Sequence, residues 1–204
     1  MKKRWIKERK KDFYYKEAKK EGYRSRAAFK LLQINKRYRI FKRGDFVIDL
    51  GCAPGGWLQV AKREVGPNGK VLGVDLVNVK PIKNVKTMIG DITHPEIIDS
   101  LKNYFPEGVD VILSDASPNI SGNWSLDHAR SVYLVEKALD IANELLKVEG
   151  RLVAKAFHGD MLDLIEDRMK DMFSFVKVHK PKASRKRSSE IYFIGKGYRL
   201  SRFL

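Results

Sequence analysis

The chain has 204 residues and one cysteine, so it is long enough for one domain with a substantial core and cannot form an intramolecular disulfide. It holds 41 Lys and Arg against 25 Asp and Glu, a formal net charge of +16 that favours a polyanionic partner. No apolar run is long enough to cross a membrane, and the basic start of the chain is unlike a secretory signal. We therefore expect a cytoplasmic single domain.

The basic residues are concentrated at the two ends of the chain. Residues 1–43 hold 18 Lys and Arg against 4 Asp and Glu, and residues 177–204 hold 9 against 1. Residues 44–176 hold 14 against 20 and are mildly acidic. Two basic segments are typical of contact with a phosphate backbone, and neither has the clean apolar face of a membrane-surface helix. We predict a nucleic-acid partner and no membrane.

The N-terminal segment, residues 1–43, is expected to be a basic RNA-contacting extension that precedes a core of residues 44–204. Its first 20 residues mix cations with aromatic rings such as Trp5, a composition that fits either a solvated helix or an arm that stacks on RNA bases. Ser25 is a candidate N-cap for a helix that continues to about Arg39. Lys30 lies beside the apolar side of that helix, where a lysine usually only reaches to solvent.

The stretch FVIDLGCAPGGW, residues 46–57, predicts a buried strand, a glycine turn and the start of a helix that runs to about Val65. A second strand ends at Asp75, twenty residues after Gly55. An acid at that distance can accept hydrogen bonds from ribose hydroxyls, so the pattern predicts a nucleoside-containing cofactor. A third strand over residues 85–90 is closed by Asp91, either as a turn former or as an acceptor for an adenine amino group.

Further strands are expected at residues 109–113, 151–157 and 191–194, with helices at about 95–104, 127–147 and 160–173. Asp115 follows the first of these strands, at the crevice where open α/β sheets bind ligands. Lys155 interrupts an apolar strand, where its ammonium group must be paired or neutral, and this marks a functional site. Glu190 is a carboxylate at the edge of the last strand. The alternation predicts a doubly wound, mostly parallel α/β sheet.

The glycine turn differs from a dinucleotide fingerprint because Pro54 stands where a helix N-terminus would receive a pyrophosphate. This favours a cofactor without phosphates, and S-adenosylmethionine (SAM) fits. The four His and one Cys show no metal-ligand spacing, so we expect no metal.

With these motifs the sequence resembles the FtsJ/RrmJ (RlmE-like) family of SAM-dependent ribose 2′-O-methyltransferases, especially its large-subunit rRNA uridine branch. The similarity covers nearly the whole chain and includes SRAAFKL, DLGCAPGGW, SDASPNISG, VAKAF and SRKRSSEIY. It implies a Rossmann-like fold with a seven-stranded sheet and helices on both faces. The family's catalytic Lys-Asp-Lys-Glu tetrad falls on Lys30, Asp115, Lys155 and Glu190. The family's SAM site falls on Gly55, Trp57, Asp75, Asp91 and Asp115.

The resemblance implies methyl transfer from SAM to a ribose 2′-hydroxyl, most simply of a uridine in large-subunit rRNA. We expect the protein to be a monomer. Lys155 would act as a base if burial and the cation of Lys30 favour its neutral form, or as an oxyanion stabiliser if it stays protonated. Two enzymatic alternatives are a tRNA and an mRNA-cap ribose methyltransferase. A protein or small-molecule methyltransferase is a further alternative, but the basic ends would then have no role. A non-catalytic ribosome-assembly factor is another, but the tetrad would then have no role.

Overall fold

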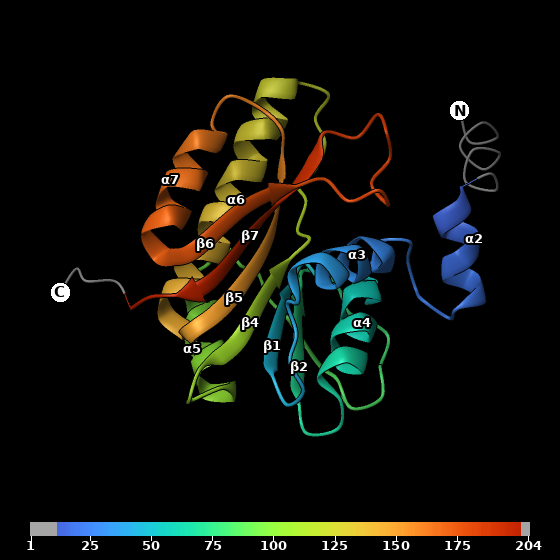
Figure 1. Cartoon of the computed structure of the whole chain (residues 1–204), viewed down its shortest axis with the longest axis vertical. Helices are drawn as coiled ribbons and strands as arrows, with labels where there is room; N and C mark the ends of the chain where they lie inside the picture. Colours follow the sequence, from blue (N-terminus) through green and yellow to red (C-terminus); the bar gives the residue numbers. More distant parts are fainter. Residues whose placement is uncertain (1–11, 201–204) are drawn as a thin grey trace.

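The computed structural model describes residues 12–200, and the expectations for Trp5 and the rest of residues 1–11 lie outside that range, as do residues 201–204. Thirteen helices and strands make up the described part (Figure 1). In chain order they are α2 (Phe13–Lys20), α3 (Ala28–Tyr38), β1 (Phe46–Leu50), α4 (Gly56–Val65), β2 (Lys70–Asp75), β3 (Lys86–Ile89), α5 (Glu96–Tyr104), β4 (Val109–Ser114), α6 (Trp124–Leu145), β5 (Leu146–Phe157), α7 (Leu162–Met172), β6 (Phe173–His179) and β7 (Glu190–Tyr198).

The strands form one seven-stranded sheet in the order β3-β2-β1-β4-β5-β7-β6. The first five are parallel, and β7 runs antiparallel to both of its neighbours, β5 and β6. Parallel strands need crossover helices, and the helical segments between the apolar runs supply them. The predicted doubly wound, mostly parallel sheet is confirmed.

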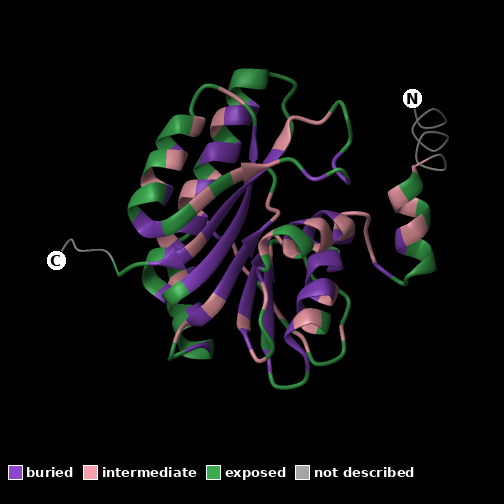
Figure 2. Ribbon diagram, viewed as in Figure 1, coloured by how far each residue is buried: buried purple, intermediate pink, exposed green. Residues whose placement is uncertain are grey.

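The helices cover both faces of the sheet (Figure 1). Helices α5, α6 and α7 pack on one face and α3 and α4 on the other, each over its own apolar core. Successive side chains of β1 point to opposite faces of the sheet, so Val47 belongs to one core and Ile48 to the other. The central strands are therefore buried on both sides (Figure 2), as expected for parallel strands with continuous apolar runs.

Two local expectations differ from the structure. Ser25 does not cap α3, because the helix begins at Ala28 after a tight turn in which Ala28 N–H donates to the Ser25 carbonyl. The Ser25 hydroxyl instead lies against Gly56 at the start of α4, where a Cβ would approach it to 2.3 Å. The last strand is also longer than expected and continues through Gly195, whose missing side chain makes room for the Phe173 ring.

Candidate active site

Three predicted carboxylates meet at the carboxyl edge of the sheet because they end or follow neighbouring parallel strands. Asp75 ends β2, Asp91 follows β3 and Asp115 follows β4. All three line a cavity of about 330 Å³. Its other lining residues are Gly51, Ala53, Leu76, Gly90, Ile92, Ala116, Ser117 and Leu134. A concave site with a few convergent polar groups among apolar walls is typical of a small-molecule pocket.

Backbone amides fix the carboxylate of Asp75. Its Oδ2 accepts a hydrogen bond from Ala53 N–H at 2.7 Å, and its Oδ1 accepts one from Val77 N–H at 3.1 Å. Each carboxylate oxygen keeps a further lone pair, so Asp75 can still accept hydrogen bonds from a ligand. The glycine turn and the end of β2 are thereby joined at the cavity wall.

Asp91 closes a turn and also reaches the cavity. Its Oδ1 accepts hydrogen bonds from the backbone N–H of Thr93 at 2.9 Å and from the Thr93 hydroxyl at 2.7 Å. These bonds lower the pKa of the Asp91 carboxyl, because they stabilise its charged form. The predicted role as a turn former is therefore confirmed, and contact with adenine stays a prediction.

The glycine turn depends on backbone conformations that favour glycine. Gly51 has a φ of 71°, and a Cβ there would lie 2.6 Å from the Cα of Ala116. Gly55 has a φ of 106° and precedes α4. The turn is thus packed directly against the segment that follows β4, and this contact forms one wall of the cavity.

Gly55 and Trp57, both predicted to hold the cofactor, are not among the residues that line this cavity. Trp57 is 3 % exposed and donates its indole N–H to the Ala27 carbonyl at 2.8 Å. Its ring lies 5.7 Å from that of Tyr192. Trp57 therefore ties α4 to the start of α3 in the structure, and its contact with the cofactor stays a prediction.

The four residues of the predicted tetrad form two ion pairs. The Lys30 Nζ lies 2.8 Å from the Glu190 Oε2. The Lys155 Nζ donates to the Asp115 carbonyl oxygen at 2.7 Å and lies 3.4 Å from the Asp115 Oδ1. Lys30 and Lys155 are only 8 % and 5 % exposed, so both ammonium groups are largely removed from water and each faces a carboxylate.

Tyr192 joins the two ion pairs. Its hydroxyl donates to the Asp115 Oδ1 at 2.9 Å, and the Lys30 Nζ lies 5.7 Å from the centre of its ring. Burial, followed by the charges of Asp115 and Glu190, raises the pKa of the Tyr192 hydroxyl well above its ordinary value. The hydroxyl therefore remains a donor to Asp115 at alkaline pH.

The β5–β7 pairing sets the spacing of these side chains. Lys155 lies opposite Tyr192 and Phe157 lies opposite Glu190 in the antiparallel ladder. Residues two apart on a strand share a face, so Glu190 and Tyr192 project toward the same side of the sheet. Helix α3 covers that side and contributes Lys30.

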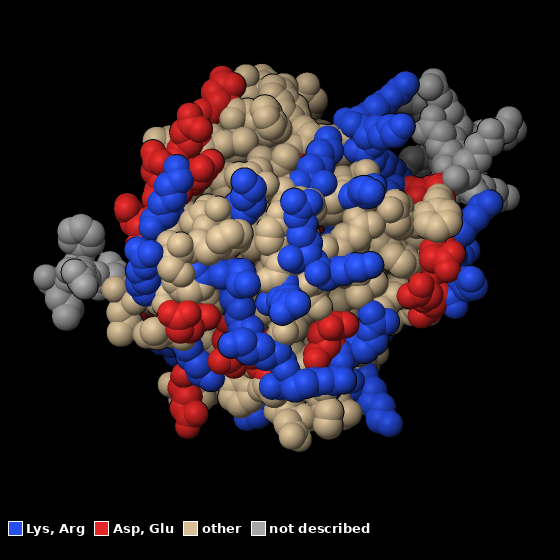
Figure 3. All heavy atoms as spheres, viewed as in Figure 1, with Lys and Arg blue, Asp and Glu red and all other residues tan. Residues whose placement is uncertain are grey.

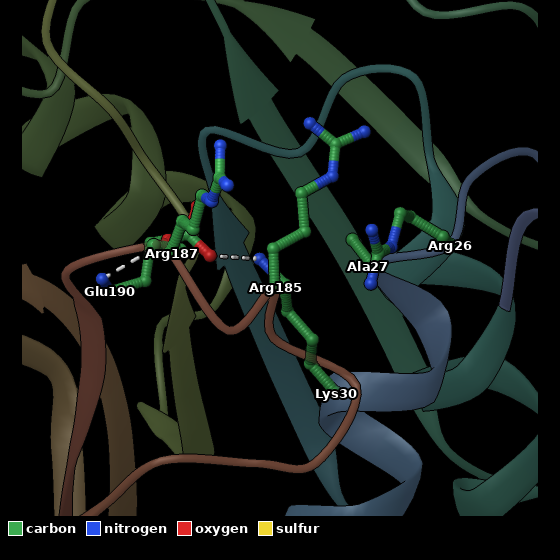
Figure 4. Close-up of a pocket in the computed structure, with 7 residues that line it drawn as sticks. Arg26, Ala27, Lys30, Arg185, Arg187 and Glu190 are labelled. Carbon is green, nitrogen blue, oxygen red and sulfur yellow. Dashed lines mark hydrogen bonds and ion pairs between the residues drawn. The ribbon is translucent and has the colours of Figure 1, made fainter. Parts of the chain in front are cut away.

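Three arginines surround the Lys30–Glu190 pair. A cavity of about 400 Å³ is lined by Arg26, Ala27, Lys30, Arg185, Arg187, Ser188 and Glu190 (Figure 4). Arg26 pairs with Asp12, and the Asp12 Oδ2 also lies 3.8 Å from the Arg185 Nε. Arg187 has no carboxylate within ion-pair distance among residues 12–200. The basic loop of residues 181–189 thus lies beside two residues of the predicted tetrad, Lys30 and Glu190.

A further carboxylate, Asp49, is buried beneath the site on β1. It is 0 % exposed, and both of its carboxylate oxygens lack a hydrogen-bond partner among the described residues. Burial raises the pKa of the Asp49 carboxyl well above its ordinary value, and the charges of Asp115 and Asp75 raise it further. Burial thus favours the protonated form of the Asp49 carboxyl over the charged form.

Within residues 12–200, no group of three or more His, Cys, Asp and Glu side chains has the geometry to hold a metal ion. No helix of this part of the chain is both long and apolar enough to span a bilayer.

The sequence profile of the FtsJ-like methyltransferase family matches residues 23–198. The chain belongs to this family. The match includes both cavities and all four tetrad residues. It also confirms the resemblance inferred from the motifs, since it covers the segments that carry them.

Similar proteins agree with the family. Ribosomal RNA large subunit methyltransferase E of Methanocaldococcus jannaschii is 53 % identical over 96 % of this chain and 82 % of its own length. The protein of the same name from Archaeoglobus fulgidus is 48 % identical over 92 % of this chain and 96 % of its own. A crystal structure described as a ribosomal RNA methyltransferase of Plasmodium falciparum aligns with a TM-score of 0.80 and 31 % identity, over 88 % of this chain and 100 % of that one.

The sequence and the family resemblance predict the tetrad, whose role stays a prediction, but they did not point to Tyr192 or Asp49. Tyr192 stands two residues after Glu190 on the same strand face, and that spacing could have indicated it. Asp49 lies inside the apolar run of β1, and a charged residue at the centre of a buried parallel strand could have indicated it by the argument that applied to Lys155.

Proposed function

We propose that this FtsJ-like methyltransferase transfers a methyl group from SAM to a ribose 2′-hydroxyl of large-subunit rRNA. Asp115 carries the proposal, because it belongs to both halves of the site. Its side chain lines the cavity at the sheet edge, and it also contacts Lys155 and Tyr192. A bound donor and an acceptor held by the lysines would meet at this residue.

The cavity at the sheet edge suits SAM. Its carboxylates, Asp75, Asp91 and Asp115, offer acceptors for ribose hydroxyls, an adenine amino group and the ammonium group of the amino-acid tail. No lysine or arginine lines it, which fits a cofactor that carries no phosphate. When bound, SAM supplies an electrophilic methyl group on a sulfonium.

The tetrad would hold the acceptor. The Lys155 Nζ already contacts two oxygens of Asp115, so it can also donate to a substrate hydroxyl that enters the site. Lys30 and Glu190, held together at 2.8 Å, are linked to Asp115 through Tyr192. These groups orient the hydroxyl and stabilise the charge that develops on its oxygen.

The proton of the hydroxyl needs an acceptor during the transfer, and the side chains nearby offer two. Neutral Lys155 would be a general base. Alternatively, Lys155 stays an ammonium group that stabilises the developing oxyanion, and a carboxylate or water takes the proton. A kcat that rises with pH and reaches a plateau would favour Lys155 as the base, whereas a kcat that does not rise with pH would favour it as the stabiliser.

The arginine-lined cavity would receive the RNA backbone. It shares Lys30 and Glu190 with the tetrad and adds Arg26, Arg185 and Arg187 (Figure 4). Guanidinium groups bind phosphates bidentately, so a phosphate next to the target ribose fits here. Relatives about 50 % identical are named large-subunit rRNA methyltransferases, which supports rRNA over the tRNA and mRNA-cap alternatives.

Lys155→Ala tests the assignment. The variant is expected to lose transfer of labelled methyl from SAM to unmodified large-subunit rRNA, while SAM affinity measured by calorimetry stays within a few-fold. Lys147→Ala is the matched control, because Lys147 lies on the same strand and pairs with Asp110 away from the site. Loss of SAM binding in Lys155→Ala would remove the catalytic role.

The substrate is tested by comparing rRNA from cells with and without this protein. A 2′-O-methyl group protects its phosphodiester from alkaline cleavage, so the modified position is expected as a gap in the cleavage ladder that vanishes without the protein. Methyl transfer to tRNA or capped RNA instead of rRNA would assign the chain to one of the other substrate classes.

A further inference from the structure

A second basic cavity lies at the far end of α3 from the tetrad. It has a volume of about 700 Å³, and its lining includes Arg37, Arg39, Lys42 and Lys196, which we call the basic face. Three aromatic residues, Tyr38, Phe41 and Phe175, also line it, and Glu149 is the only acid in its lining. This cavity shares no lining residue with the arginine-lined cavity at the tetrad.

The sheet is incompletely covered here. The ring of Tyr38, at the end of α3, lies 5.3 Å from His179 and 6.3 Å from Phe175 on β6. Phe175 is nevertheless 43 % exposed, so α3 reaches β6 without covering it. Lys and Arg side chains outnumber acidic ones over the middle of the visible face, where β6, β7 and α3 lie (Figure 3).

Most of the basic face is electrostatically unpaired. Among residues 12–200, no carboxylate lies within ion-pair distance of Arg37, Arg39 or Lys42. Arg151, also in the lining, differs because it is buried and bonded to Asp45 and to the Ile40 carbonyl. The exposed cations are therefore available to a partner, whereas Arg151 supports the loop beneath them.

Only some of the cations of the basic face stabilise the C-terminal end of α3. Arg37 lies in the last turn of α3, and the Lys196 Nζ donates to the Tyr38 carbonyl at 2.9 Å, so both complement the negative end of the helix dipole. The side chains of Arg39 and Lys42 lie beyond the helix and donate to none of its carbonyls; only the Arg39 backbone N–H does, to Asn35. Unpaired cations around a concave surface with exposed aromatic carbon are the pattern of a polyanion site.

We propose that the basic face is a second phosphate-binding site for the rRNA substrate, remote from the nucleotide that is methylated. The inference rests on the proposed function, since it takes rRNA as the substrate. At 1.5 Å per residue, the seven residues from Lys30 to Arg37 span about 10 Å along α3. One helix thus joins the tetrad to the basic face, and an RNA that continues past the target ribose can reach both.

The test replaces Arg37, Arg39 and Lys42 together by Gln, which removes three charges and leaves a shorter polar side chain at each position. The control, Lys80→Gln/Lys83→Gln/Lys86→Gln, removes three exposed charges near β3, at the opposite end of the sheet. Both are titrated with an in vitro transcript of large-subunit rRNA at 50 and 200 mM salt. Methylation kinetics and SAM affinity are measured on the same preparations.

Each lost phosphate contact lowers the slope of log K against log salt by about 0.7 for single strands and 0.9 for duplexes. For three contacts, the ratio of Kd at 200 mM to Kd at 50 mM is expected to fall about 20- to 40-fold below that of the unmodified protein. KM for rRNA rises, whereas kcat at saturating rRNA and SAM affinity do not change. The control variant keeps the salt slope of the unmodified protein.

Two outcomes overturn the proposal. One is an unchanged salt slope in the Arg37/Arg39/Lys42 variant, which would leave the basic face to another class of partner, such as an acidic protein. The other is an equal loss in the control variant, which would reflect net charge alone. Failure of the proposed function is distinguishable from both, because the unmodified protein would then transfer no methyl group to rRNA.

Discussion

The Tyr192 hydroxyl donates a 2.9 Å hydrogen bond to the Asp115 carboxylate and so links β7 to the residue shared by the cofactor cavity and the tetrad. Because Lys155 lies opposite Tyr192 in the β5–β7 ladder, one strand pairing positions both partners of Asp115. The Tyr192 hydroxyl contacts Asp115, so it would act on the reaction through that carboxylate. It is a positioning residue, and its removal tests that role.

Tyr192→Phe is expected to lower kcat about tenfold or more, because a hydrogen bond to a charged group contributes about 1.5–3 kcal/mol. SAM affinity is expected to change less than kcat. Tyr198→Phe is the control on the same strand, since the Tyr198 hydroxyl bonds Asn143 away from the site. Equal kinetic effects in both variants would show that Tyr192 contributes only to folding.

Asp75→Asn is expected to weaken SAM binding by about tenfold or more, measured by calorimetry, because the charged acceptor for ribose hydroxyls is lost. The amide can still accept one hydrogen bond, from Ala53 or Val77, so thermal stability should change little. Asp99→Asn, on the exposed side of α5, provides the control. Unchanged affinity would remove Asp75 from the cofactor site.

The Lys30–Glu190 pair should behave as a unit. Lys30→Met and Glu190→Gln each leave a largely buried partner without its counter-charge, so each is expected to destabilise the fold by about 1–3 kcal/mol. The double variant is expected to cost less than the sum of the two, as measured by urea unfolding in a double-mutant cycle. Strict additivity would mean that the 2.8 Å contact contributes no coupling energy.

Asp49 predicts a pH dependence of stability with an unusual sign for a carboxyl. Its pKa is raised in the folded state, so the native protein binds more protons than the unfolded chain above the ordinary Asp range. The free energy of unfolding therefore falls as pH rises from about 4 toward the native pKa, by at most about 1.4 kcal/mol per pH unit.

Asp49→Asn removes this titration and should become more stable relative to the unmodified protein as pH rises. Denaturant unfolding at several pH values measures the difference. Asp45→Asn is a contrasting control, because Asp45 is paired with Arg151 and its substitution breaks a buried ion pair. If the difference in free energy of unfolding between Asp49→Asn and the unmodified protein did not vary with pH, the prediction that Asp49 titrates above the ordinary Asp range would be wrong.

The central architecture was predictable because its signals are local. Apolar runs closed by glycine or acid predicted the parallel strands, and the positions of Asp75, Asp91 and Asp115 at strand ends predicted the shared edge. Lys155 could be identified because an ammonium group in an apolar strand needs a partner. Its partner could not be identified from spacing, since the contact depends on the crossover between β4 and β5.

The contacts that could not be predicted from the sequence depend on long-range packing. Ser25 fits the composition of a helix cap, but its hydroxyl is held against Gly56 in α4, and only the folded chain brings these residues together. The assignment of Trp57 to the cofactor comes from the family resemblance and stays a prediction, whereas the hydrogen bond from its indole N–H to the Ala27 carbonyl could not be predicted from the sequence. Lys30 could be named as a site residue only from the family resemblance, because its partner Glu190 lies 160 residues away in the chain.

The order of the strands separates the two halves of the site along the chain. The carboxylates of the cofactor cavity lie within residues 75–115, whereas Glu190 and Tyr192 belong to the final strand, which is inserted between β5 and β6. During synthesis, the cofactor half can therefore form before Glu190 and Tyr192 are made, so the Lys30–Glu190 pair and the Tyr192–Asp115 hydrogen bond form last. A ribosome-bound chain that stops short of β7 would carry the glycine turn and the carboxylates of the cofactor cavity without these two contacts.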